Sequence, residues 1–294
     1  MSSIKSRNVS REDKNAIVGG VLYLVATPIG NLSDITERAL KVMSEVDFIA
    51  AEDTRNTGKL LAYFGIQKSM ISYFEHNKRE KGEYILSRLQ NGESCALLTD
   101  AGTPAISDPG EDLVRLCAEN GVTVTSIPGC SAVVNALALS ALPTGRFCFE
   151  GFLSTNKNER FSRLEEIKSD RRTTVFYEAP HKLKKTLEDI FSVFGDRKIA
   201  LCRELTKLNE EIIRTSLSSA IEYYEANEPR GEYVLVIEGA SEEAIKSDSF
   251  FAHMSVLEHL DYYVSQGMSK MDATKAVAKD RGVAKSVIYK EINK

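Results

Sequence analysis

The sequence has none of the glycine-rich loops by which many enzymes hold nucleotides. Neither a GxGxxG dinucleotide loop nor a GxxxxGKS/T phosphate loop occurs in its 294 residues. Their absence disfavours NAD enzymes, P-loop nucleotide hydrolases and methyltransferases with a glycine-rich loop after the first strand. No apolar run approaches the ~20 residues of a membrane-spanning helix, so we expect no membrane span.

Paired cysteines are missing as well. The five cysteines form no CxxC pair and stand at positions 95, 117, 130, 148 and 202. This pattern argues against a disulfide framework and a zinc site, and it favours a reducing, cytoplasmic compartment. The four histidines, at positions 76, 181, 253 and 259, show no metal-ligand spacing, so we predict no metal site. A net charge of -4 gives no overall sign of nucleic-acid binding.

The first half of the chain alternates apolar runs with helical patterns. The apolar runs lie at 21–26, 46–51, 95–99 and 122–127. The helical patterns lie near 33–44, 56–64, 78–90 and 109–119. Because such alternation usually produces a parallel sheet, we predict an N-terminal α/β domain over residues 20–145.

A break at 143–145 separates this half from a second set of elements. The expected strands there are 147–149, 173–177, 199–202 and 233–237, with helices near 157–168 and 180–194. They indicate a second α/β domain over residues 146–240. We further expect a mobile lead segment over 1–19, a polar linker over 241–251 and a helical tail over 252–294.

The tail differs in character from the body. Lys and Arg outnumber Asp and Glu within it, whereas the rest of the chain is acidic, which suggests a contact with a polyanion. Short helical patterns break at Gly267 and Gly282, and residues 269–272 resemble a capping box. This arrangement is typical of a helix-turn-helix, but a helical cap or a dimerisation arm explains it equally well.

Three expected strands end in loops of Pro and Gly that begin helices, at residues 27–31, 99–110 and 127–131. Open α/β sheets build ligand sites at such strand ends. In the second loop, Gly102 allows close approach of a ligand, and Asp100 offers a carboxylate to an ammonium or a hydroxyl. The alternative is an ordinary turn with a helix cap at Ser107 or Asp108 and Pro109 at the first helical position. A cap of this kind does not exclude a ligand.

A fourth motif, Glu52-Asp-Thr-Arg55, follows the expected strand 46–51. Arg55 carries forked donors that suit a phosphate. Asp53 is placed to orient Arg55 or to contact a ribose. The alternative is a helix cap with an ion pair in the first turn.

The ordered set of motifs resembles a known family. It consists of residues 27–35, 52–55, 99–110, 127–132, 150–153, 176–181 and 203–207. A single Pro-Gly loop is a weak signal, but the set in this order and spacing is highly specific. It is similar to the bacterial 16S rRNA cytidine ribose 2′-O-methyltransferases of the tetrapyrrole methylase superfamily, densely over residues 21–240 and more loosely in the tail.

The resemblance implies two α/β domains with S-adenosylmethionine (SAM) in the cleft between them, usually within a homodimer. It also implies methylation of a cytidine ribose in the decoding region of 16S rRNA, within the small ribosomal subunit. The cofactor-binding residues carried over are Pro28, Asp100, Gly102, Thr103, Ile106, Cys130, Ser131, Tyr177 and Leu205. Family members often have Pro or Ala where this chain has Cys130, which is a small change.

A ribose hydroxyl is a poor nucleophile that benefits from losing its proton as it attacks. Candidate catalytic residues are Glu178 or Glu204 as the base and Lys207 as an electrostatic aid, although a surface salt bridge is the alternative for each. On the substrate side the resemblance favours Asp53, Arg55 and His181. An RNA path could be lined by Arg160, Arg163, Arg171, Arg172, Lys182, Lys184 and Lys185.

Two other functions fit parts of the pattern. One is a tetrapyrrole C-methylase, which would need neither the 52–55 motif nor a basic tail. The other is a non-catalytic regulator that senses a ligand with its body and binds nucleic acid with its tail, which would bind SAM without turnover. The 52–55 motif and the tail favour RNA methylation over the C-methylase, and the regulator is disfavoured because no site motif is visibly broken.

Overall fold

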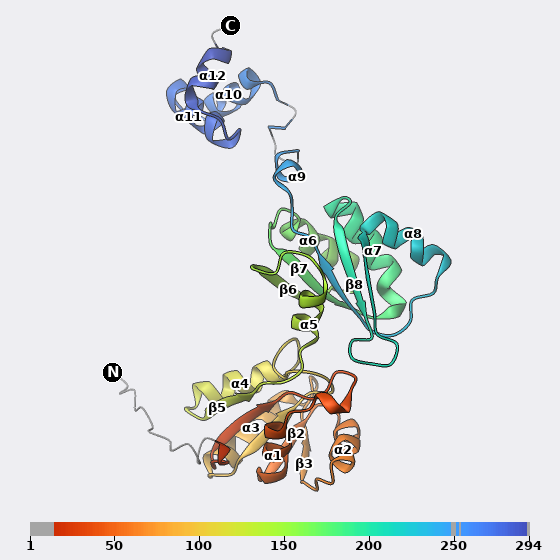
Figure 1. The fold of residues 1–294 in the computed structure, drawn as a ribbon. Coiled ribbons are helices and arrows are strands. Elements are labelled where there is room, and N and C mark those ends of the chain that lie inside the picture. Colours follow the sequence, from red (N-terminus) through yellow and green to blue (C-terminus); the bar gives the residue numbers. More distant parts are fainter. Residues whose placement is uncertain (1–14, 248–250, 253, 293–294) are drawn as a thin grey trace.

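The computed structural model describes residues 15–247, 251–252 and 254–292. Two α/β domains, each with a five-stranded sheet, are followed by a helical tail beyond the second domain (Figure 1). The α/β fold class predicted from the sequence is confirmed. Residues 1–14 of the expected lead segment lie outside the described residues. Among the described helices, none combines the length and the apolar character needed to cross a membrane.

The sheet of the first domain has the order β3-β2-β4-β1-β5 and is entirely parallel, as predicted. Its strands are β1 (Val21–Val25), β2 (Phe48–Ala51), β3 (Met70–Ser72), β4 (Cys95–Leu98) and β5 (Thr123–Ile127). The central strands β2 and β4 are buried along their whole length, which explains their unbroken apolar runs. The sequence missed β3, a short edge strand without a buried residue.

Helices cover both faces of this sheet. They are α1 (Glu37–Glu45), α2 (Thr54–Tyr63), α3 (Lys78–Gln90) and α4 (Gly110–Glu119), with a short 3-10 helix at Leu32–Asp34. Val42 and Met43 of α1 pack in the core of one face, and Leu89 of α3 and Leu113 of α4 pack in the core of the other.

The sheet of the second domain is mixed, with the order β6-β7-β10-β8-β9. Its strands are β6 (Phe147–Phe152), β7 (Thr173–Glu178), β8 (Lys198–Arg203), β9 (Glu211–Ser216) and β10 (Tyr233–Ile237). Strand β10 runs antiparallel between β7 and β8, and it pairs Tyr233 with both Glu178 and Arg203. The sequence missed β9, whose residues are all at least partly exposed.

Helices α6 (Lys157–Ile167), α7 (Pro180–Phe194) and α8 (Leu217–Ala226) contribute to the core on one face of the second sheet. Helix α5 (Ala132–Leu139) packs on the opposite face, where Val133 and Leu137 meet Val234 and Val236 of β10. The core of the second domain therefore recruits a helix that precedes the break at 143–145.

The tail contains α10 (Val256–Ser265), α11 (Lys270–Asp280) and α12 (Lys285–Ile292), which share a small core, and α9 (Glu242–Ser247) lies within the expected linker. At the start of α11, the Ser269 hydroxyl accepts a hydrogen bond from the Asp272 amide and donates one to the Asp272 carboxylate. A reciprocal capping box stands instead at Ser255 and Glu258, at the start of α10. Whether α11 and α12 act as a helix-turn-helix stays a prediction.

Candidate active site

A cavity of about 440 Å³ lies between the two domains. Loops after β1, β2 and β4 line it from the first domain, and the ends of β7 and β8 with the start of β10 line it from the second. Ser131 and Ala132, at the start of α5, complete the wall. The site thus lies at the carboxyl ends of the parallel strands, where α/β sheets bind ligands.

Two loops of the first domain are joined at the floor of the cavity. The amides of Thr27 and Gly102 each donate to the other residue's carbonyl, at 2.9 and 3.1 Å, and the Thr27 hydroxyl donates to the Thr99 carbonyl at 3.2 Å. Gly102 has a φ of +85°, and a Cβ on it would lie 3.4 Å from Ile29. The position therefore requires glycine for its conformation, and it brings bare backbone to the cavity.

Two carboxylates of the first domain are held at this floor. Asp100 accepts the side-chain amide of Asn56 at 3.0 Å, and Glu52 accepts the Thr99 hydroxyl at 2.7 Å. Both carboxylates line the cavity. The network connects the ends of the adjacent strands β2 and β4, so each carboxylate has a defined position.

The helix cap predicted at Ser107 or Asp108 is wrong, because the cap of α4 is Pro109 and no side-chain hydrogen bond caps the helix. The Asp108 carboxylate accepts the Gly110 amide at 2.7 Å and the Ala105 amide at 3.0 Å. Helix α4 begins at Gly110, one residue later than expected. Asp108 therefore holds the turn before α4 together and also lines the cavity.

Backbone strain gathers on both sides of the cavity. Ala105 and Ser107 on one side, and Glu204 and Thr206 on the other, have φ values between 52° and 67°. Such conformations cost energy in non-glycine residues and concentrate at functional sites. Across the gap, a Cβ on Gly30 would come within 2.8 Å of the Leu205 carbonyl. The first loop and the strained loop after β8 thus leave no room for a side chain at Gly30.

The wall from the second domain includes aromatic side chains. Tyr177 packs edge-on against Phe149, with ring centroids 4.9 Å apart, and lies 5.5 Å from the ring of Phe152. Burial raises the pKa of Tyr177. Phe152 is 59% exposed although it lines the cavity. These rings with Leu205 offer an apolar surface for a flat ligand group.

Lys207 stands between two carboxylates at the cavity. Its ammonium donates to Glu204 and to Glu232, each at 2.8 Å. Burial alone would raise the pKa of Glu204, but the hydrogen bonds from Lys207 and the Glu232 amide hold it below its ordinary value. Conversely, burial would lower the pKa of Lys207, yet its two carboxylate partners raise it. Lys207 is therefore positively charged at neutral pH, between the two carboxylates.

Glu178 is buried at the end of β7 and also lines the cavity. One of its oxygens accepts the Ala179 amide at 2.8 Å, and the other accepts the Thr186 hydroxyl. Ala179 is the cap of α7, which has no side-chain cap of its own, and Pro180 begins the helix. Glu178 therefore anchors the start of α7 at the cavity wall.

Asp53 and Arg55 lie outside the cavity lining and form the cap and ion pair that the sequence left as the alternative. Asp53 accepts the Arg55 amide at 2.8 Å and faces its guanidinium at 2.7 Å. The hydrogen bonds from Arg55 lower the pKa of Asp53 to about 2. The Arg55 side chain is 86% exposed. His181, in the first turn of α7, is exposed and also lies outside the lining.

The structure brings most of the predicted cofactor residues together. Those that line the cavity are Asp100, Gly102, Thr103, Ile106, Ser131, Tyr177 and Leu205. Pro28 and Cys130 are outside the lining, although their neighbours Ile29 and Ser131 are part of it. The Cys130 carbonyl accepts the Thr103 hydroxyl at 2.9 Å, so Cys130 supports the loop from behind.

Of the predicted catalytic residues, Glu178 and Lys207 line the cavity, and Glu204 reaches it through Lys207. Sequence reasoning left Glu52, Phe152 and Glu232 without a role although they line the cavity. Glu52 carried a signal, since it is the first residue after β2 in a motif already noted. Glu232 had none, because its place depends on the pairing of β10.

Comparisons with known proteins agree with this architecture. A family model described as tetrapyrrole (corrin/porphyrin) methylases matches residues 21–221. A curated protein of Halalkalibacterium halodurans, named ribosomal RNA small subunit methyltransferase I, is 45% identical to this chain over 95% of each of the two chains. The protein of that name in Escherichia coli O157:H7 is 44% identical, over 92% of this chain and 94% of its own.

Solved structures resemble the chain at lower identity. A cobalt precorrin-4 methyltransferase of cobalamin biosynthesis superposes with a TM-score of 0.55 at 17% identity, covering 74% of this chain and 95% of its own. A diphthine synthase superposes with a TM-score of 0.57 at 14% identity, covering 74% and 90%. At these identities the likeness shows the fold alone.

Proposed function

We propose that this chain, which belongs to the tetrapyrrole (corrin/porphyrin) methylase family, transfers a methyl group from SAM to the RNA of the small ribosomal subunit. The observation that carries the proposal is the identity of more than 40% over nearly the whole chain to small-subunit rRNA methyltransferases of several bacteria. The acceptor we propose is the ribose 2′-oxygen of a cytidine in the decoding region of 16S rRNA. The enzyme would act in the cytoplasm as a homodimer.

The cavity fits SAM in size and chemistry. Its volume of about 440 Å³ falls within the roughly 300–1,000 Å³ of small-molecule sites. Asp100 offers a carboxylate to the methionyl ammonium, the bare backbone at Gly102 allows close approach, and the rings of Tyr177 and Phe152 suit the adenine. Carboxylates outnumber cationic groups in the lining, which favours a sulfonium cation. When bound, SAM supplies the methyl group on that sulfonium.

The protein's own part is to position the acceptor oxygen and to remove its proton. We assign the proton acceptor to Glu52, whose carboxylate lines the cavity and has Thr99 as its one hydrogen-bond partner among the described residues. Glu178, the acceptor predicted from the sequence, has both oxygens engaged in anchoring α7. The role of Glu178 as the base stays a prediction, and comparison of the Glu52→Gln and Glu178→Gln variants tests it.

Lys207 supplies positive charge beside the developing alkoxide, and its permanent charge rules it out as a base at neutral pH. The lowered pKa of Glu204 makes it a poor proton acceptor, so its proposed role is to position Lys207. On the substrate side we propose that Arg55, held by Asp53, contacts a phosphate, and that the exposed His181 contacts the RNA beside the start of α7.

The direct test is methyl transfer from labelled SAM to 30S subunits and to free 16S rRNA, both from cells that lack the modification. Mass spectrometry then locates the labelled nucleotide. We expect label on the ribose of a decoding-region cytidine, and the comparison of particle with free RNA shows which is recognised. SAM binding without label on either substrate would refute the proposal and favour the sensor, and label on a tetrapyrrole instead would favour the C-methylase.

A further inference from the structure

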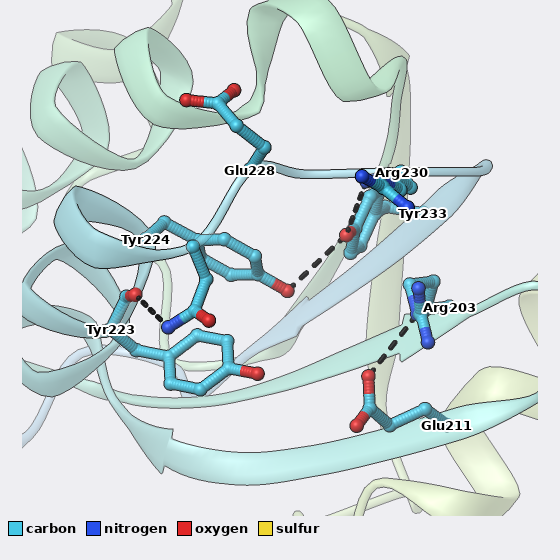
Figure 2. Close-up of a pocket in the computed structure, with 8 residues that line it drawn as sticks. Arg203, Glu211, Tyr223, Tyr224, Glu228, Arg230 and Tyr233 are labelled. Atoms are coloured by element: carbon cyan, nitrogen blue, oxygen red, sulfur yellow. Dashed lines mark hydrogen bonds and ion pairs between the residues drawn. The ribbon is translucent and has the colours of Figure 1, made fainter.

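A second hollow lies beside the cleft, at the end of α8 (Figure 2). It measures about 260 Å³ and is lined by Arg203, Glu211, Tyr223, Tyr224, Asn227, Glu228, Arg230 and Tyr233. Tyr223 and Tyr224 reach it from α8, Arg203 ends β8, and Tyr233 begins β10. Of these residues, Tyr233 alone also lines the cleft.

The hollow lies next to the proposed methyl-transfer cleft. Tyr233 lines both of them. A smaller depression shares both arginines with the hollow, and its lining consists of Arg203, Glu204, Asn209, Arg230 and Gly231. Glu204 in turn accepts a hydrogen bond from Lys207 of the cleft. A strand whose reacting sugar lay in the cleft would therefore meet this surface with an adjacent nucleotide.

The arginines make the hollow suitable for a phosphate. The Arg230 side chain is exposed, and within the part of the chain that the structure describes it has no acidic partner. Its own amide donates to the Tyr233 hydroxyl at 3.3 Å, which fixes the backbone that carries it. The nearby Glu228 is matched by Lys184 at 2.8 Å, and Arg203 is held by Glu211 at 3.1 Å. Arg230 thus leaves an unmatched fork of donors, which suits a phosphate.

The tyrosines provide a stacking surface. Tyr223 is 45% exposed and packs edge-on against Tyr224, with centroids 5.0 Å apart. Tyr224 is buried, and its hydroxyl donates to that of Tyr233 at 3.3 Å. Figure 2 shows the rings of Tyr223 and Tyr224 projecting from α8 toward the side of the hollow where Arg203 and Arg230 lie. Exposed, braced aromatic rings are what proteins use to stack the bases of single-stranded RNA.

We propose that this hollow binds the nucleotide next to the methylated one, with its base stacked on Tyr223 and its phosphate at Arg230. The inference rests on the proposed function, because it takes RNA as the substrate. In this arrangement the cofactor and the RNA bind at neighbouring surfaces of opposite charge. The acidic cleft suits the cationic cofactor, and the arginines beside it suit the anionic strand.

The test uses the full-length chain and a fluorescein-labelled RNA hairpin that copies the decoding region. Tyr223→Ala should weaken hairpin binding roughly 5- to 160-fold, as for the loss of one stacked base, while Tyr223→Phe keeps the ring and should bind as the wild type does. Arg230→Gln should weaken binding and reduce the salt dependence by about one counterion. The KM for 30S subunits should rise with kcat little changed, and SAM affinity measured by calorimetry should not move.

The matched control is Arg146→Gln, an exposed arginine next to the start of β6, at the opposite end of the sheet from the cleft. If Tyr223→Ala and Arg230→Gln bind the hairpin like this control while the wild type methylates rRNA, the subsite is refuted and the proposed function stands. If the wild type neither binds nor methylates rRNA, the proposed function itself fails and the subsite falls with it. Thermal melts of all variants show whether any loss reflects unfolding.

Discussion

Gly30 and Leu205 belong to different domains, yet a Cβ on Gly30 would lie 2.8 Å from the carbonyl of Leu205. The same atom would lie 2.4 Å from the Lys207 side chain and 2.9 Å from the Thr206 hydroxyl. The loop after β1 and the strained loop after β8 therefore meet with no room for a side chain. Ile29, Leu205 and Lys207, from these same two loops, line the cleft.

Gly30→Ala should therefore force the two loops apart. We expect overpacking to lower the free energy of unfolding by about 1–3 kcal/mol and to weaken SAM binding, as measured by thermal melting and calorimetry. The control is Gly58→Ala, inside α2, where the nearest atom is 3.6 Å away. It should stabilise the protein by about 0.5–1 kcal/mol, because alanine favours a helix over glycine. Equal melting and affinity in Gly30→Ala and the wild type would contradict the account.

Asp100→Asn should weaken SAM binding without unfolding the protein. The variant keeps an oxygen for the Asn56 amide but removes the charge offered to the ligand's ammonium. We expect a loss of about 1.5–3 kcal/mol, as for hydrogen bonds to charged groups, measured by calorimetry. Asp261→Asn, on the exposed face of α10, is the matched control. An affinity unchanged in both variants would remove Asp100 from the cofactor site.

Glu52→Gln and Glu178→Gln should separate catalysis from positioning. In Glu52→Gln the amide oxygen still accepts the Thr99 hydroxyl, so we expect unchanged melting and SAM affinity with kcat lower by about 10²-fold or more. In Glu178→Gln one of two donors, the Ala179 amide or the Thr186 hydroxyl, faces an amide nitrogen. That change should cost about 1–3 kcal/mol of stability. A large loss of kcat confined to Glu178→Gln would instead make Glu178 the base.

Glu204→Gln should move the alkaline limb of the kcat–pH profile to lower pH. Partners raise the pKa of Lys207 above its ordinary value of 10.5, so its charge and the stability it adds are present below 10.5 and are lost as pH rises through the folded-state pKa. Removing the Glu204 charge lowers that pKa. Glu238→Gln, which removes the partner of Lys198 at 3.6 Å, makes the same exchange at the opposite end of β8. A limb unmoved in Glu204→Gln, or moved equally in both variants, would contradict the role of Lys207.

Local patterns predicted the first domain well because its site is built from contiguous pieces. Each piece is a buried strand, a loop of Gly and Pro, and a helix, so Asp100 and Gly102 could be assigned from a single stretch of sequence. The role of Asp53 as a helix cap could also be proposed from the sequence, because a cap involves only residues two or three positions apart. The second domain was harder, because β9 and α8 were both missed and strand pairing there joins distant segments.

The sequence by itself determined the alternation of elements, the strand-end loops and the family, since these depend on neighbouring residues and on motif order. Tertiary structure alone decided that β10 inserts antiparallel between β7 and β8, which sets Tyr233 beside Glu178 and Arg203. It also decided that α5 packs on the second sheet and that Glu232 meets Lys207. The physical reason is that hydrogen bonds between strands and burial between domains join residues far apart in the sequence. The spacing of residues along the chain does not specify which distant segments will pair.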